Sequence, residues 1–261
     1  MYHLTAHIHG ASYRICVESP LNLAIPLDFG GTQPNHFSAP LASVQPLRVG
    51  SFIGDTAQGG SCNVDMLTLV PHCNGTHTEC KGHIENPLCT TLDQFSLPLM
   101  PVYVGTVMPC QVPDTKDTYT SLQQAGDWVI PKSALKTAFS AAPPLSAWVI
   151  RTLPNEANKK TRCYTEGEAP PYFTFEAMDF LLALPLRHLL VDFPSIDRMY
   201  DGGKMHNHHL FWAASPSGTI TEMIFVDPAI RDGLYLLDLQ VPAFRRDAAP
   251  SRPLLYPLEP L

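Results

Sequence analysis

Short apolar runs separated by proline and glycine dominate the hydrophobic pattern of the chain. Runs rich in β-branched and aromatic residues are typical of strands. They predict strands at 63–71, 101–108, 127–130, 147–152, 189–193 and 219–226. Near the start, two alternating segments on either side of Gly10 predict a hairpin. The elements are expected to be short, because 26 prolines are spread along the chain and each removes a backbone donor.

Helical periodicity is confined to the middle and the later part of the chain. A helix is predicted at 174–184, where Thr174 is a suitable N-cap and apolar residues recur at helical spacing. A shorter helix is predicted at 131–139 with Pro131 at its first position, and another at 205–214. Helices alternate with strands only in the middle, while the two ends are rich in strands. The pattern therefore predicts a mixed α/β fold and not a doubly wound sheet.

A long loop at 28–50 contains Gly, Pro, Asn and Ser throughout. Loops of this length in a compact domain are often functional, although ordered surface packing explains the composition equally well. If the loop belongs to a binding site, the side chains that we expect to face a substrate are Gln33, Asn35, His36 and Phe37.

The densest chemistry follows directly after the predicted strand at 63–71. Residues 73–83 read CNGTHTECKGH and place a thiol, two imidazoles and a carboxylate close together. A Gly-Thr pair between the first two allows a tight backbone turn. Sulfur, nitrogen and oxygen donors at this spacing predict a transition-metal site, most simply for zinc. The alternative is a polar loop whose histidines are satisfied by hydrogen bonds.

Composition narrows the remaining possibilities. An apolar share of 45% and a charged share of 16% describe a globular protein, and we expect a single domain over residues 1–261 because no repeat or linker is evident. The net charge of −7, without a Lys/Arg cluster, argues against nucleic acid. No apolar run predicts a membrane span, and the first ten residues do not predict a secretory signal. Seven cysteines without paired spacing predict reduced thiols and a cytoplasmic location.

The stretch at 73–83 resembles the His-x-Gly-Thr-His-x-Asp-x-Pro-x-His signature of the putative cyclase family, which includes bacterial kynurenine formamidase (arylformamidase) and isatin hydrolase. Further segments are similar to the family's Asp-x-x-Ser-x-Asp strand end, its His-His and Glu-Asn-Leu pair, and its C-terminal Asp-Gly-x-Pro-x-Arg turn. They lie at 192–197, 208–209, 222–224 and 247–252, so the resemblance covers about residues 60–261. It implies a swivelling β/β/α fold, usually assembled as a homodimer or larger homo-oligomer, that binds zinc or manganese.

The resemblance also implies roles for particular residues. His83 falls on the general acid/base of the family. The metal ligands fall on Cys73, His77, Glu79, His208 and Glu222. Cys73 replaces the family's His, and its sulfur makes a manganese site less likely than zinc; Glu79 replaces Asp. His72 would supply the missing imidazole if the loop were shifted by one position.

The activity implied by the resemblance is hydrolysis of an amide or lactam C–N bond in a small aryl or cyclic substrate, through a metal-activated water. Two alternatives stay open at this point. The Cys73 and Glu79 replacements would also suit a catalytically degenerate binding protein of the same fold. In the other alternative, Cys73 is a covalent nucleophile paired with His77 or His83 and no metal takes part.

Overall fold

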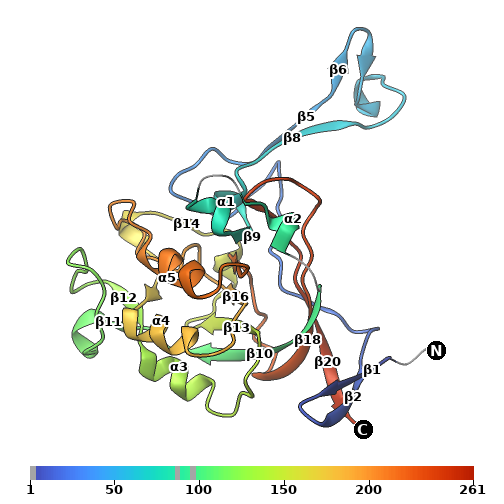
Figure 1. Cartoon of the computed structure of the whole chain (residues 1–261). Coiled ribbons are helices and arrows are strands. Elements are labelled where there is room, and N and C mark those ends of the chain that lie inside the picture. The colour runs from blue at the N-terminus through green and yellow to red at the C-terminus, as the bar shows by residue number, and fades with distance from the viewer. Residues whose placement is uncertain (1–3, 86–88, 95–97) are drawn as a thin grey trace.

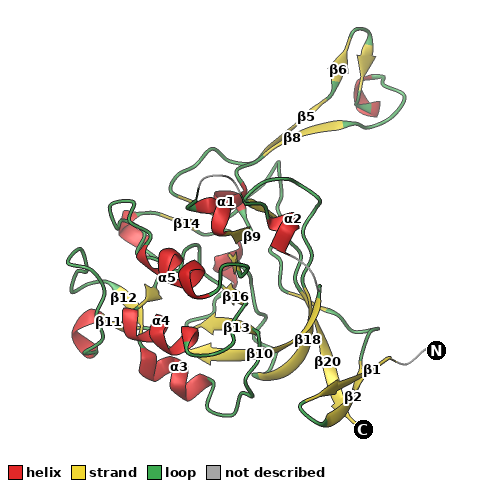
Figure 2. Ribbon diagram, in the orientation of Figure 1, coloured by secondary structure: helices red, strands yellow, loops and turns green. Residues whose placement is uncertain are grey.

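A central mixed sheet organises the computed structural model, which describes residues 4–85, 89–94 and 98–261 (Figures 1 and 2). Four parallel strands form its middle, in the order β10 (Leu99–Val107), β13 (Ala147–Thr152), β16 (His188–Val191) and β17 (Thr219–Glu222). Antiparallel strands extend the sheet beyond β10, namely β18 (Gly233–Asp238), β20 (Leu254–Pro260), β2 (Ala11–Ile15) and β1 (Leu4–Ile8). Beyond β17 lie β9 (His77–Cys80) and β19 (Ala248–Pro250), also antiparallel.

Short elements complete the architecture. The remaining strands are β3 (Leu21–Asn22), β4 (Asn35–His36), β5 (Ser43–Pro46), β6 (Arg48–Val49), β7 (Phe52–Ile53), β8 (Asp65–Thr68), β11 (Cys110–Gln111), β12 (Trp128–Ile130), β14 (Cys163–Tyr164) and β15 (Tyr172–Phe173). The α-helices are α1 (Pro71–Asn74), α2 (Thr91–Gln94), α3 (Lys132–Ala138), α4 (Phe175–Leu182) and α5 (His206–Ala214). The 3₁₀ turns of the described residues are η1 (Thr56–Gln58), η2 (Lys81–His83), η3 (Val112–Asp114), η4 (Ala157–Lys160) and η5 (Glu166–Glu168). Each helix within the described residues is too short or too polar to span a bilayer.

Both faces of the parallel strands are largely buried, which explains the apolar runs within β10, β13 and β16. Side chains alternate between two cores: Trp148 and Ile150 of β13 pack toward α3, α4 and α5, whereas Val149 packs on the opposite face with β18 and β20. Gly105 on β10 lets the helical layer approach closely, because a Cβ at that position would lie 2.6 Å from the Phe139 ring. Figure 2 shows the three longer helices together on one side of the sheet.

The mixed α/β fold predicted from the sequence is confirmed. The strands β10, β12, β13 and β16, the hairpin of β1 and β2, and the helices α4 and α5 lie where the pattern predicts them. The Thr174 hydroxyl accepts a hydrogen bond from the backbone N–H of Ala177 and so caps α4 as expected. Two boundaries differ: Pro131 is the N-cap of α3 and not its first residue, and β17 ends at Glu222 because Met223 has a φ of +55°.

The predicted loop at 28–50 divides into two parts in the structure. Residues 28–42 stay against the body of the molecule and include β4. From residue 43 the chain leaves the body in an antiparallel ribbon of β5 and β8, tipped by β6 and β7 (Figure 1). We call residues 43–68 the arm. The strand predicted at 63–71 is thus β8, a strand of the arm and not of the central sheet.

Candidate metal centre

The strand β9 supplies the first two side chains of the site. His77 and Glu79 are two residues apart, so they project from the same face of the strand. Thr78 between them points the other way and hydrogen-bonds Thr221 and Ser251. Because β9 pairs antiparallel with β17, Glu222 lies opposite His77, and the Nε2 of His77 is 3.6 Å from an Oε of Glu222. The site therefore begins at the carboxyl end of a parallel strand.

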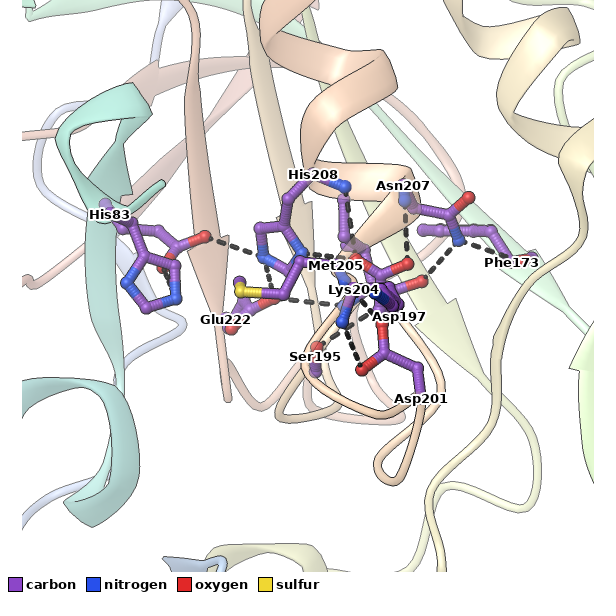
Figure 3. Close-up of polar contacts among 12 residues, drawn as sticks. His83, Phe173, Ser195, Asp197, Asp201, Lys204, Met205, Asn207, His208 and Glu222 are labelled. Atoms are coloured by element: carbon purple, nitrogen blue, oxygen red, sulfur yellow. Dashed lines mark hydrogen bonds and ion pairs between the residues drawn. The ribbon is translucent and has the colours of Figure 1, made fainter. Parts of the chain in front are cut away.

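Two further imidazoles reach Glu79 from helices. The Nε2 of His208, on the first turn of α5, lies 3.1 Å from Oε1 of Glu79. The Nδ1 of His72, on α1, lies 3.0 Å from the other oxygen, Oε2. Potential donor atoms thus converge in two groups that share Glu79: one with His72 and His77, the other with His208 and Glu222. Figure 3 shows His208 and Glu222 facing each other, with His83 beyond them.

Each of these three imidazoles is held at its second ring nitrogen. The Nε2 of His72 lies 2.9 Å from Asp247, and the Nδ1 of His208 lies 2.6 Å from Asp197. The Nδ1 of His77 is 2.9 Å from the carbonyl oxygen of Gly75. Imidazoles that bind metals in proteins are characteristically fixed in this way, by a carboxylate or carbonyl on the nitrogen that faces away from the ion. The arrangement leaves one nitrogen of each ring directed at the carboxylates.

The burial of the cluster makes its charges important. Burial by itself would raise the pKa of Glu79, but the charge of His208 and hydrogen bonds from His208 and His72 lower it well below the usual range. Burial would lower the pKa of His208, yet Glu79 and Asp197 raise it well above its usual range. Burial likewise would lower the pKa of His72, but hydrogen bonds with Asp247 and Glu79 raise it to about 10. The charges of His208 and His72 thus favour the ionised form of Glu79 in the absence of a cation.

A divalent cation fits this donor set. The Nε2 of His77 is buried and has no hydrogen-bond partner within the described part of the chain, although it faces Glu222. A buried polar atom without a partner is costly, and a cation would satisfy it together with the carboxylates. Three imidazole nitrogens with two carboxylates form a donor set that suits zinc or manganese.

Cys73 does not join the donors as the resemblance implies. It lines the cavity above the cluster, but it is in none of the groups of converging donor atoms found among the described residues. Its neighbour His72 faces Glu79 instead. This is the alternative in which the loop is shifted by one position relative to the family motif. Since successive residues of a helix point about 100° apart, only one of the two faces Glu79. Burial and the charge of Glu222 raise the pKa of the Cys73 thiol.

His83, the predicted acid/base, lies at the edge of the cluster on η2. Its ring stacks on His72 with centroids 4.0 Å apart. Its Nε2 is 3.8 Å from Oε2 of Glu79, and its Nδ1 is 3.6 Å from Oδ2 of Asp247. These contacts also place His83 in a third group of possible donors, with His72 and Asp247. Asp247, to which we assigned no role from the sequence, is therefore shared by two histidines.

The residues predicted to face a substrate separate into two kinds. Gln33 donates to the carbonyl oxygens of Asp28 and Ala42 and accepts from the Ala42 N–H, so its amide holds the loop together. His36 and Phe37, in contrast, line a cavity of about 570 Å³ that opens onto His72, Glu79, His83, His208 and Glu222. Burial and the charge of His77 lower the pKa of His36 to about 4.

The chain belongs to the putative cyclase family, because the family model described as Putative cyclase matches residues 4–198. Among curated proteins, none matches the chain. Solved structures are similar in fold at low identity. A predicted metal-dependent hydrolase from Bacillus stearothermophilus has 16% identity, with a TM-score of 0.60 over 91% of this chain and 98% of the other. Isatin hydrolase A from Labrenzia aggregata has 15% identity, with a TM-score of 0.64 over 91% and 93%. The enzyme of that name from Ralstonia solanacearum has 12% identity, with a TM-score of 0.65 over 91% of both chains.

Proposed function

We propose that the protein is a metal-dependent hydrolase that cleaves the C–N bond of a small aryl or cyclic amide. The observation that carries this proposal is the buried donor cluster itself. Each of its three imidazoles has one ring nitrogen next to a carboxylate or carbonyl oxygen outside the cluster, and the other nitrogen faces Glu79 or Glu222. A cavity large enough for a small molecule opens onto the cluster. The structural neighbours described as metal-dependent hydrolase and isatin hydrolase support the same class.

Zinc is the metal that we propose, held by His72, His77, Glu79, His208 and Glu222. His72 takes the place that the resemblance gave to Cys73. Because the converging donors are nitrogen and oxygen only, the sulfur-based reason for preferring zinc over manganese is weaker, and manganese is the second choice. When bound, either ion supplies Lewis acidity and lowers the pKa of a coordinated water, to ~7 for zinc.

His83 is proposed as the proton donor to the leaving nitrogen. Its Nε2 faces the cluster, while Nδ1 is directed at Asp247. A carboxylate beside Nδ1 favours the doubly protonated ring, which then carries a transferable proton at Nε2. The half-buried position of His83 beside the cavity suits a group that exchanges protons with substrate. Asp197 and Asp247 hold His208 and His72 in place and keep their donor nitrogens unprotonated when the ion is bound.

The two alternatives receive less support. A nucleophilic cysteine needs a lowered thiol pKa, whereas burial and the charge of Glu222 raise the pKa of Cys73. A degenerate binding protein would not need two groups of converging donor side chains that share Glu79, with their outer hydrogen bonds intact. Kynurenine formamidase activity and isatin hydrolysis both remain within the proposed class.

The test combines metal analysis with turnover. Protein purified without chelator is expected to contain zinc or manganese in a stoichiometric amount, and the metal-free form to regain it on incubation. The loaded protein is then assayed against formanilide, isatin and a small aryl lactone. Loss of turnover on chelation and its return with zinc would support the proposal. Full activity in metal-free protein would refute it and favour Cys73.

We further infer a homodimer or larger homo-oligomer in which the arm contacts a second copy of the chain. Val44 and Leu67, which lie opposite each other in the ribbon, are 41% and 54% exposed. An isolated two-stranded ribbon of this kind has only marginal stability in water. A cytoplasmic location is also proposed, because all seven cysteines are free, as expected in a reducing compartment.

A further inference from the structure

One wall of the cavity holds a polar side chain that the proposed hydrolysis does not use. His36 is the second residue of β4, which pairs in parallel with β14 so that His36 lies beside Tyr164. Its side chain is only 3% exposed, yet neither ring nitrogen has a hydrogen-bond partner within the described part of the chain. It is also in none of the groups of possible metal donors. A buried imidazole with both nitrogens unpaired points to a partner that comes from outside the chain.

The polar neighbours of His36 in the same loop do have hydrogen-bond partners. The Gln33 amide donates to the carbonyl oxygens of Asp28 and Ala42, and the Asn35 amide donates to the carbonyl oxygen of Ala39. The loop thus satisfies its own polar side chains on both sides of β4. His36 alone is left to face the cavity that it shares with the metal centre.

An aromatic pair stands at the mouth of the same cavity. The Phe37 ring is 51% exposed, lies 4.0 Å from the ring of His36 and meets Tyr200 edge-on at 5.9 Å. Phe37 and Ser38 both have left-handed backbone angles, with φ of +57° and +52°. Such angles are strained for residues other than glycine and tend to persist at functional sites. The strain holds a large apolar ring at the opening and His36 behind it.

The charges around the cavity exclude one kind of ligand. Arg198 is the one lysine or arginine among its lining residues, and its guanidinium is already bound to Asp127 and to the carbonyl oxygen of Tyr200. With an ion bound to the imidazoles, the other charged lining groups are carboxylates, including Asp197 and Asp201. A substrate carboxylate entering here would meet no free cation apart from the metal, so an uncharged substrate is favoured.

We propose that His36 is a specificity-determining residue, which hydrogen-bonds an uncharged polar group of a planar aryl substrate whose ring packs against Phe37 and Tyr200. This inference rests on the proposed function for the position of the reacting bond, but the binding that it describes is measurable without turnover. An imidazole that carries no charge offers one N–H donor and one acceptor, so either a carbonyl oxygen or an amide N–H of the substrate satisfies it.

The experiment compares His36→Leu with His36→Gln in metal-loaded protein. The leucine removes both polar atoms, while the glutamine keeps a donor and an acceptor. The matched control is His188→Leu, since His188 is a similarly buried histidine outside the cavity, bonded to Thr219. Formanilide and 4-formamidobenzoate are the probes, which differ by one carboxylate. KM, kcat, metal content and Tm are measured, and the binding of each probe is titrated calorimetrically.

His36→Leu is expected to raise KM and Kd for formanilide by about tenfold or more, with unchanged metal content, because the substrate group is left unpaired. His36→Gln recovers most of the affinity, and His188→Leu changes Tm only. Wild-type protein prefers formanilide over the charged probe by at least about tenfold. Phe37→Asn, which tolerates the left-handed backbone, should fold and also weaken formanilide binding.

Other outcomes overturn the inference in distinguishable ways. Loss of metal in His36→Leu would make His36 a ligand. If KM and Kd of His36→Leu and Phe37→Asn stayed within about twofold of wild type, neither residue would contact the substrate, and both would serve only to pack the protein. If the wild type bound formanilide without turning it over, the proposed hydrolysis would be refuted. The Kd values of the His36 variants would still test the role of His36 in binding. Failure of the wild type to bind formanilide, or preference for the charged probe, would refute the uncharged aryl ligand itself.

Discussion

The metal centre and the arm are built in opposite ways. At the centre, His77, Glu79 and Glu222 sit on strands of the central sheet and are at most 3% exposed, and each imidazole has contacts at both ring nitrogens. In the arm, every residue of β8 is exposed and no residue between 43 and 68 belongs to a hydrophobic core cluster of the described chain. The chain itself therefore packs around the centre, whereas the arm has no core of its own in the described chain, and for this reason we propose that it contacts a second copy.

The difference has a consequence for substitutions. Changes at the centre should act through metal and chemistry, with little effect on assembly. Changes in the arm should act through assembly and leave the metal in place. Each of the following measurements tests that separation.

The largest effect is expected for His77→Ala. The imidazole is fully buried and directed at Glu222, so its removal leaves the ion without a donor that no other side chain can replace. Metal content should fall below half, and kcat/KM by more than the ~10²-fold that an outer-sphere change costs. Elemental analysis and turnover measure this. Retention of full metal content would show that the ion lies elsewhere.

His83→Ala should separate chemistry from metal binding. We expect metal content close to that of wild type and a fall in kcat of ~10²–10⁴-fold, as is usual on loss of a general acid/base. The reason is that His83 is at the edge of the cluster, 3.8 Å from Glu79. If His83→Ala and His77→Ala lost the same amount of metal, His83 would be a ligand and its assignment as proton donor would be wrong.

Asp247→Asn should have an intermediate effect. Asp247 lies 2.9 Å from the outer nitrogen of His72, and hydrogen bonds from His72 and His83 lower the pKa of the Asp247 carboxyl. Loss of such an outer carboxylate typically weakens metal affinity or activity ~10–100-fold. Competition with a zinc-binding dye measures the affinity. An unchanged affinity and an unchanged kcat would remove Asp247 from the site.

Charges in the arm should act on assembly alone. Val44→Asp with Leu67→Asp places two carboxylates on one face of the ribbon, where the wild-type side chains are exposed and apolar. We expect a shift from dimer or larger species to monomer, with metal content unchanged. Sedimentation velocity reads the assembly state. Wild-type protein that sediments as a monomer at all concentrations would contradict the proposed role of the arm.

The smallest effect is expected for Cys73→Ala. Its thiol lines the cavity without joining the groups of converging donors, so metal content and kcat/KM should stay within about threefold of wild type, the size of a modest surface or packing change. Inactivation with full metal occupancy, together with a covalent adduct on the native thiol, would instead identify Cys73 as the nucleophile.

Local patterns in the sequence were sufficient for much of the fold. The buried runs of β10 and β13 and the Thr174 cap of α4 depend on neighbours within a few residues, and the structure has them where predicted. The strand β9 was not predicted, because the stretch at 73–83 was read as a loop with a tight turn; the two-residue repeat of that strand places His77 and Glu79 on one face. The family resemblance added His208 and Glu222, which no spacing rule connects to residue 77.

Only the tertiary structure decided which side chains meet. The sequence determined that His72 and Cys73 are adjacent, but the rotation of α1 against β9 turns the imidazole and not the thiol toward Glu79. Asp247 reaches His72 across 175 positions because β19 pairs with β9. The run at 63–71 has the same pattern in an arm as in a core, since alternation specifies a strand and not its location. Contacts between distant segments depend on tertiary packing, which a local sequence pattern does not encode.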